Sequence, residues 1–181
     1  MIFILTITIL AIIIIVIYFA FRPKKEDEEE IKPDEKVNME NVRTHFKFIS
    51  EIETIFNVVE AYLETYKNTL TQYPLLVNPY AFMLAVRMVE QGRKGREFGV
   101  LAQGAIDTDL ETQAEWAIST LIKDTKRWHT GSLAKGKKED YPTFIHYFSD
   151  KWCPIGADND PNNLNKYWLP NFQKFYSLFK P

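Results

Sequence analysis

The sequence predicts an all-α fold, and three observations support this. Residues 42–70 place an apolar side chain at every seventh position, as an amphipathic helix does. Asn78 followed by Pro79 is a typical helix start, because asparagine caps the first turn and proline suits its first position. No segment alternates apolar and polar residues over the length of a β-strand. We therefore expect helices joined by loops.

Composition limits the partners of the chain. Its 181 residues carry a net charge of -2, so a nucleic acid is not an expected partner. Cys153 is the single cysteine, so no intramolecular disulfide can form. The three histidines are scattered without the spacing of metal ligands. We expect no metal and no cofactor.

The first element expected is a membrane anchor over residues 1–22. Residues 2–21 form an uncharged apolar run, about the length that crosses a hydrocarbon core of ~30 Å. A cleaved signal peptide would need a basic segment before this run and a small-residue cleavage site after it, and both are missing. Arg22, Lys24 and Lys25 follow the run, which by the positive-inside rule favours a cytoplasmic position for the rest of the chain.

A solvated linker and a long helix come next. Residues 23–37 contain two prolines and a block of acids, with too few apolar side chains to form a core. Residues 38–72 are predicted to form one long amphipathic helix, whose stripe packs on the domain that follows. The alternative is a coiled coil through which the chain self-associates, although His45 would occupy its seam.

The remaining residues, 73–181, are predicted to form a helical domain. Its first helix runs from Pro79 to about Gln91, with Gly92 as a left-handed stop. A second begins at the capping box of Thr108 and Glu111 and continues to Gly131. Two shorter helices are expected, at residues 143–152 and at residues 163–179 with an interruption at Pro170.

Glu90 is the candidate catalytic residue. It shares a helix face with Met83 and Val86, so partial burial and the negative end of the helix dipole both favour its protonated form. An acid that stays protonated near neutral pH suits general acid catalysis. The alternative is an ordinary surface charge that turns outward to Arg87, Arg93 or Lys94. Three glycines that follow, Gly92, Gly95 and Gly99, would let the backbone bend back and leave an open cleft beside the acid.

Several segments resemble a known family. The stretches "AVRMVEQG", "GREFGVLAQ" and "DLETQAEWAISTLIKDTKRW" resemble the lysozyme-superfamily muramidases and lytic transglycosylases of phage particles and endolysins. The closing segments "YPTFIHYFSDKW" and "DPNNLNKYWLPNF" look like the last helices of the same group. The resemblance covers residues 78–179 and implies a lysozyme-like fold, cleavage of the glycan strands of bacterial peptidoglycan, and Glu90 as the catalytic acid. Gln91 stands where many relatives have serine.

Further site residues are expected around this acid. Aromatic side chains near loop ends could stack on sugars, and Gln103 could bond to an acetamido group. These substrate-binding candidates are Phe98, Gln103, Tyr147, Trp152 and Tyr167, whereas Trp116, Phe144 and Phe148 are assigned to the core. Asp107 or Asp109 could supply a second carboxylate, although Asp109 also suits the first turn of a helix. Without one, Glu90 would act as acid and then as base.

The expected protein is thus a single-pass, membrane-anchored glycosidase, either a lytic transglycosylase or a lysozyme-type hydrolase. A place in the membrane of a phage particle would reconcile the topology rule with an extracellular substrate. The alternative is the bacterial inner membrane, with the domain facing the periplasm. Two other interpretations remain: a non-catalytic structural or interaction protein on a lysozyme-like scaffold, and a holin-like pore former.

Overall fold

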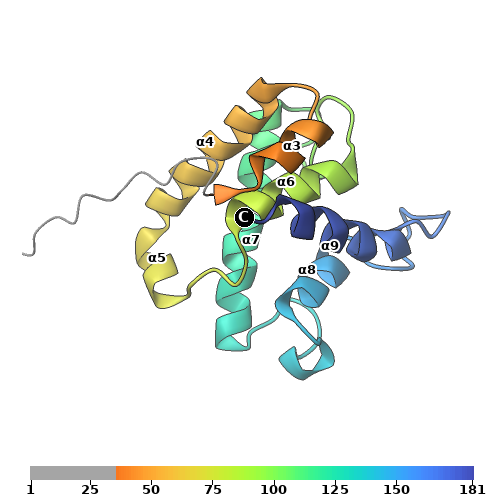
Figure 1. Cartoon of the computed structure of the whole chain (residues 1–181). Coiled ribbons are helices and arrows are strands. Elements are labelled where there is room, and N and C mark those ends of the chain that lie inside the picture. Colours follow the sequence, from red (N-terminus) through yellow and green to blue (C-terminus); the bar gives the residue numbers. More distant parts are fainter. Residues whose placement is uncertain (1–35) are drawn as a thin grey trace, which may run out of the picture. The chain divides into compact units, whose positions relative to one another are not determined.

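Helix α6, Pro79–Glu90, is the central element of the structure, a computed structural model that describes residues 36–181. It packs against helices α4, α7 and α9 (Figure 1). Ala81 to Val86 are all buried, because a helix that is apolar on every side must be surrounded by other elements. The Asn78 side chain accepts a hydrogen bond from the Ala81 N–H at 3.0 Å, which confirms the predicted helix start.

The predicted long helix of residues 38–72 is wrong, since the chain forms three helices there: α3 (Met39–His45), α4 (Ile49–Thr65) and α5 (Lys67–Gln72). Phe46 and Phe48 adopt extended backbone conformations between the first two. Phe46 is thereby buried, while Phe48 stays 56% exposed. Burial of Phe46 and a shorter α4 let both helices reach the core, which a straight rod could not do.

The apolar stripe of α4 packs inward, as one of the two interpretations predicted. Ile52, Ile55 and Val59 are buried, and α4 contacts both α6 and α7. The start of α3 is also tied to the end of α9, since the Asn38 N–H donates to the Phe179 carbonyl at 2.9 Å. One core therefore extends from α3 to α9, and the predicted boundary between residues 72 and 73 crosses it.

The remaining helices are α7 (Leu110–Thr130), α8 (Phe144–Trp152) and α9 (Trp168–Phe179), with short 3-10 turns at Lys138–Asp140 and Asn165–Tyr167. Asp109, not Thr108, caps α7, because its carboxylate accepts the Thr112 N–H at 2.8 Å. Pro170 does not interrupt α9, since it lies in the first turn, where a missing N–H costs nothing.

The all-α prediction is confirmed for residues 36–181, where the structure contains helices and no strand. No helix in this part of the chain is both long and apolar enough to cross a membrane. The predicted anchor and nearly all of the predicted linker lie outside the described residues.

Asn78 should contribute measurably to stability. Beyond the helix cap, its Nδ2 donates to the Lys36 carbonyl at 2.8 Å and its N–H donates to the Tyr176 hydroxyl at 2.9 Å. Asn78→Ala removes the cap and the Nδ2 bond, so we expect the free energy of unfolding to fall by about 2 kcal/mol in chemical denaturation. Asn78→Asp keeps the cap acceptor and should lose less; an equal loss would contradict the capping role.

Candidate active site

The C-terminal end of α6 presents Glu90 to a pocket. The helix ends at the next residue because Gln91 adopts a left-handed conformation, with φ 43°. The predicted stop at Gly92 is therefore wrong by one residue. Gly92 is required for a different reason: a Cβ there would collide with the Arg96 carbonyl, so only glycine lets the loop turn back so tightly.

Two tryptophans hold the Glu90 carboxyl group. Nε1 of Trp152, the last residue of α8, donates to Oε1 at 2.8 Å, and Nε1 of Trp168, the first residue of α9, donates to the same oxygen at 2.8 Å. Arg87 pairs instead with Glu51 of α4. Among residues 36–181, no lysine or arginine forms an ion pair with Glu90.

This environment favours the neutral form of the acid. Burial raises the pKa of Glu90 above its usual value, because a desolvated carboxylate is poorly stabilised. The hydrogen bonds from Trp168 and Trp152 lower the pKa, but they offset only part of the effect of burial. The direction predicted from the sequence is confirmed, with desolvation as the main cause.

The loop after α6 folds back across the acid. Gly99 adopts φ +66°, and a Cβ at this position would lie 2.6 Å from Cδ of Glu90 and closer still to its Oε2. A side chain at residue 99 would therefore occupy the space of the carboxyl group. The backbone bends back past the acid, as predicted from the glycines, but it also comes into close contact with the carboxyl group at Gly99, which was not predicted.

Gln113 of α7 fixes the shape of this loop. Its side chain is fully buried, and its Nε2 donates to the carbonyls of Gly95, Val100 and Ala105. Its Oε1 accepts the Val100 N–H at 3.3 Å. One amide group thus replaces the backbone partners that an irregular loop lacks.

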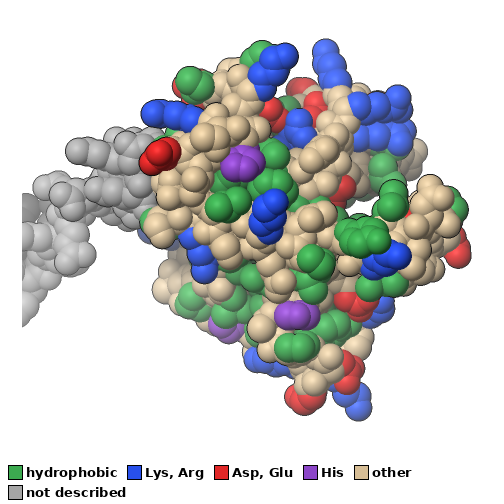
Figure 2. Space-filling model, turned by 45° about the vertical axis from the view of Figure 1, so that its right-hand side comes forward, with side chains coloured by type: hydrophobic (Ala, Val, Ile, Leu, Met, Phe, Trp, Pro, Cys, Tyr) green, Lys and Arg blue, Asp and Glu red, His purple; other side chains and the backbone are tan. Residues whose placement is uncertain are grey.

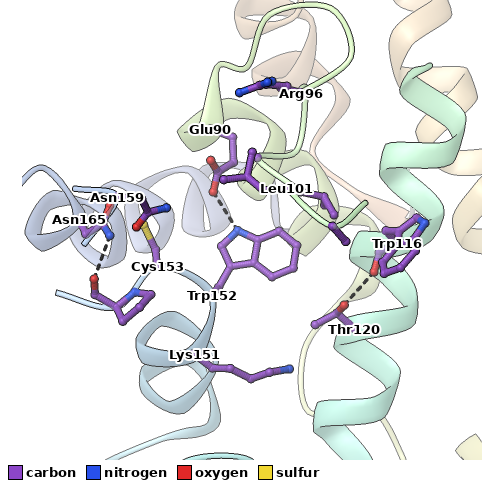
Figure 3. Close-up of a pocket in the computed structure, with 14 residues that line it drawn as sticks. Glu90, Arg96, Leu101, Trp116, Thr120, Lys151, Trp152, Cys153, Asn159 and Asn165 are labelled. Carbon is purple, nitrogen blue, oxygen red and sulfur yellow. Dashed lines mark hydrogen bonds between the residues drawn. The ribbon is translucent and has the colours of Figure 1, made fainter. Parts of the chain in front are cut away.

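The acid lines a pocket of about 580 Å³. Figure 3 shows Trp152 between two sides of it, with Asn159, Asn165 and Cys153 on one side and Trp116 and Thr120 on the other. The full lining is Glu90, Arg96, Gly99, Val100, Leu101, Ala102, Trp116, Thr120, Lys151, Trp152, Cys153, Pro154, Asn159 and Asn165. A volume of this size accommodates a ligand of a few sugar rings.

Large apolar side chains are exposed near this pocket. Leu101 and Trp116 belong to its lining, and Ile155, Leu164 and Tyr167 lie along the segment between α8 and α9. In the face drawn in Figure 2, hydrophobic side chains likewise reach the surface among the cations. A pocket bordered by exposed apolar side chains suits a ligand with both apolar and polar faces, as sugars have.

Only one of the five predicted substrate-binding residues lines the pocket, namely Trp152. Phe98 and Tyr147 are 0% exposed, so both assignments to substrate binding are corrected. Phe98 belongs to the core, and the Tyr147 hydroxyl donates to the buried Asp124 at 3.3 Å. Gln103 and Tyr167 are exposed but lie outside the pocket lining.

Other aromatic residues were assigned in part correctly. Phe144 and Phe148 lie in the core as expected. Trp116 does not: it is 42% exposed and lines the pocket, because it lies off the buried stripe of α7. Trp168 was not predicted for the site. A buried indole needs a partner for its N–H, which is the one signal that could have pointed to it.

Neither candidate for a second carboxylate lies in the pocket lining. Asp107 pairs with Arg96 at 3.4 Å on the surface. Asp109 caps α7, and its hydrogen bonds with Thr112 lower the pKa of its carboxyl group. Glu90 is thus the single acidic residue among those that line this pocket.

A metal centre and a reactive thiol are two other kinds of site that depend on particular side chains. Residues 36–181 contain no cluster of three or more side chains that could hold a metal ion. Cys153 lines the pocket, but burial, with a smaller contribution from Glu90, raises the pKa of its thiol to about 12. The thiol is therefore protonated at neutral pH and is a poor nucleophile. Asp160 accepts the N–H groups of Leu164 and Asn165 at the start of the 3-10 turn Asn165–Tyr167, so its carboxylate is engaged by the backbone of this segment.

Gly99→Ala should displace the acid. We expect a loss of about 1–2 kcal/mol in the free energy of unfolding from the left-handed backbone, together with a weakened contact between Glu90 and the two tryptophans. Gly131→Ala is the matched control, since Gly131 has φ +71° with no atom within 4 Å of its added Cβ. Gly131→Ala should lose only the backbone contribution, whereas Gly99→Ala should lose more because of the collision with Glu90, and only Gly99→Ala should change the pKa of Glu90 in a carboxyl ¹³C NMR titration. Equal pKa values of Glu90 in the two variants would show that residue 99 does not contact its carboxyl group.

Comparison with protein-family models, with curated proteins and with solved structures gives no match for this chain.

Proposed function

We propose that the chain is a peptidoglycan-cleaving glycosidase with a lysozyme-like fold, in which Glu90 is the general acid and then the general base. The observation that carries the proposal is a desolvated carboxyl group on a pocket, held through one oxygen by two indole N–H groups. A raised pKa extends the pH range in which this group is protonated upward, which suits donation of a proton to the leaving oxygen of a glycosidic bond.

The absence of another acid from the pocket lining favours a single-residue mechanism. Glu90 would give its proton to the glycosidic oxygen between the two sugars as the bond to the anomeric carbon breaks. The resulting carboxylate would then accept a proton from the attacking hydroxyl group. If that group is water, the enzyme is a hydrolase; if it is a hydroxyl of the same sugar, the enzyme is a lytic transglycosylase. We favour the transglycosylase, because neither Asp107 nor Asp109 lines the pocket.

The non-catalytic alternative makes a different prediction about the acid. A structural or interaction protein would have no reason to bury a carboxylate on an open pocket and would be expected to pair it with Arg87 or Arg93. Arg87 is instead bound to Glu51, and within residues 36–181 the donors to Glu90 are the two neutral indole N–H groups. Burial of an acid without a cation costs stability, which is easiest to explain by a functional role.

We further propose that residues 2–21 anchor the enzyme in a membrane, in keeping with their uncharged apolar sequence. A phage particle that contains a membrane would carry the enzyme to the cell wall during entry or release it at lysis. The bacterial inner membrane, with the domain in the periplasm, is the alternative location.

The test is direct. The full-length chain in detergent is incubated with purified peptidoglycan, turbidity is followed, and the soluble fragments are identified by mass spectrometry. Fragments with anhydro-muramyl ends would identify a transglycosylase, and reducing ends a hydrolase. Glu97→Gln is the matched control, since Glu97 is a buried glutamate of the same loop region and does not line the Glu90 pocket. If the wild-type chain releases no fragments, or Glu90→Gln releases them as fast, the proposal fails.

A further inference from the structure

The two oxygens of Glu90 have different surroundings. Oε1 accepts both indole N–H groups, whereas among residues 36–181 no hydrogen bond to Oε2 is formed. A carboxyl oxygen has two lone pairs, so two donors occupy the acceptor capacity of Oε1. Oε2 lies against Gly99, whose own N–H is already donated to the Arg96 carbonyl at 3.0 Å.

The direction of both indoles is fixed by ring stacking. Trp152 stacks on Phe148, with ring centres 5.2 Å apart and planes 18° from parallel. Trp168 stacks on Phe172 at 5.0 Å and 4°. Phe148 and Phe172 are buried, and both contact the ring of Phe82 in α6. The core therefore sets the positions of the two N–H groups, and these groups set the orientation of the carboxyl plane.

We propose that Trp152 and Trp168 are positioning residues that make Oε1 the carbonyl oxygen of the protonated acid and leave the proton on Oε2, beside Gly99. This inference rests on the proposed function for its catalytic meaning, but the hydrogen-bonding arrangement can be tested without turnover. It places the glycosidic oxygen next to Oε2 and Gly99, and gives Gly99 a reason to lack a side chain.

The arrangement also affects the proton transfer itself. As the proton moves from Oε2 to the glycosidic oxygen, the bond between that oxygen and the anomeric carbon breaks, and Glu90 becomes a carboxylate. Hydrogen bonds to a charged acceptor are stronger than those to a neutral one. The two indole donors therefore stabilise the product of the transfer more than the starting acid. The attacking hydroxyl group then bonds to the anomeric carbon and returns its proton to Oε2.

The test uses Trp152→Phe and Trp168→Phe, which keep an aromatic ring and remove the N–H. Infrared difference spectra of the full-length chain, taken across the titration of Glu90, should show the C=O band of the protonated acid at higher frequency in each variant, because a carbonyl loses a donor. The band is the one that disappears in Glu90→Gln. If the proton were on Oε1, the carbonyl would be Oε2, and the band would not move.

A second readout is the titration itself. Loss of a donor to the carboxylate should raise the pKa of Glu90 in both variants, followed by carboxyl ¹³C NMR, and should move the basic limb of the pH–activity profile in the same direction. We expect kcat to fall roughly tenfold for each N–H removed, with a smaller change in KM. Trp128→Phe is the control, because Trp128 packs on Phe144 and Tyr147 and should change neither the band nor the pKa.

The possible failures are distinguishable. An unmoved band and an unchanged pKa in both variants would overturn this inference, even if the wild-type chain cleaves peptidoglycan. A moved band in a chain that cleaves nothing would support the hydrogen-bonding arrangement and overturn the proposed function. Should the buried Trp168 be required for folding, Trp152→Phe gives the same decision, since Trp152 is less buried.

Discussion

Glu90→Gln should lower the rate of peptidoglycan cleavage roughly 10²–10⁴-fold, the usual contribution of a general acid or base. Glutamine has nearly the same shape, and its amide oxygen can still accept the N–H groups of Trp152 and Trp168. It cannot give up a proton to a leaving oxygen. The loss should therefore appear in kcat, while KM stays close to that of the wild-type chain. A turbidity assay over a range of peptidoglycan concentrations measures both.

The same variant should be more stable than the wild-type chain at neutral pH. Below pH 4.5, the usual pKa of this group, Glu90 is protonated in the folded and unfolded states alike. Above it, the unfolded chain releases the proton while the folded chain keeps it, so the stability of the wild type falls until the pH passes the raised folded pKa. Glutamine does not titrate.

The difference in unfolding free energy between Glu90→Gln and the wild type should therefore grow as the pH rises from 4.5 and become constant above the folded pKa. Chemical denaturation at a series of pH values measures it. A difference that does not change with pH would mean that Glu90 has the same pKa in both states. That result would remove the electrostatic support for a catalytic acid.

Gln113→Leu should cost about 3 kcal/mol of unfolding free energy, or about 1 kcal/mol for each of the two amide hydrogens shared among the three carbonyls and for the bond that its Oε1 accepts from Val100. Leucine fills a similar volume but donates nothing to Gly95, Val100 or Ala105. The loop that carries Gly99 should then open, and its amide hydrogens should exchange faster with solvent. Hydrogen-exchange mass spectrometry of residues 92–107 would detect this change.

Gln173→Leu is the control for Gln113→Leu, since Gln173 is exposed on α9 and its replacement should change stability by no more than about 0.5 kcal/mol. Peptidoglycan cleavage should also fall in Gln113→Leu, because the loop forms one border of the pocket. A variant that keeps wild-type exchange rates in this loop would show that backbone contacts alone hold its shape.

The sequence predicted local features of the fold better than long-range ones. The Asn78–Pro79 start and the end of α7 at Gly131 depend on the residues at those positions, and both were predicted correctly. The single long helix failed for a physical reason. Its seven-residue repeat was real, but burial of Phe46 in the core stabilises a bend that no local pattern indicates.

In the candidate site, too, local features could be predicted from the sequence and long-range contacts could not. Glu90 could be found from its helix face, its helix end and the glycines after it. Its hydrogen-bond partners could not: Trp152 was expected near the acid only as a sugar-binding residue, and Trp168 was not expected there at all. Both come from other helices and meet the acid through tertiary packing. Tyr147 was misassigned for a related reason: a tyrosine near a helix end has a hydroxyl that can bond inside the protein as easily as outside it.

Residues 153–167, the segment between α8 and α9, are held at both ends by Oε1 of Glu90. Trp152, just before the segment, and Trp168, just after it, both donate to this oxygen. Cys153, Pro154, Asn159 and Asn165, which form one border of the pocket, all belong to it. Substitutions or insertions inside the segment would reshape that border without moving its attachment points. It is therefore the part of the chain where selection or design can change which saccharide fits while the acid keeps its place.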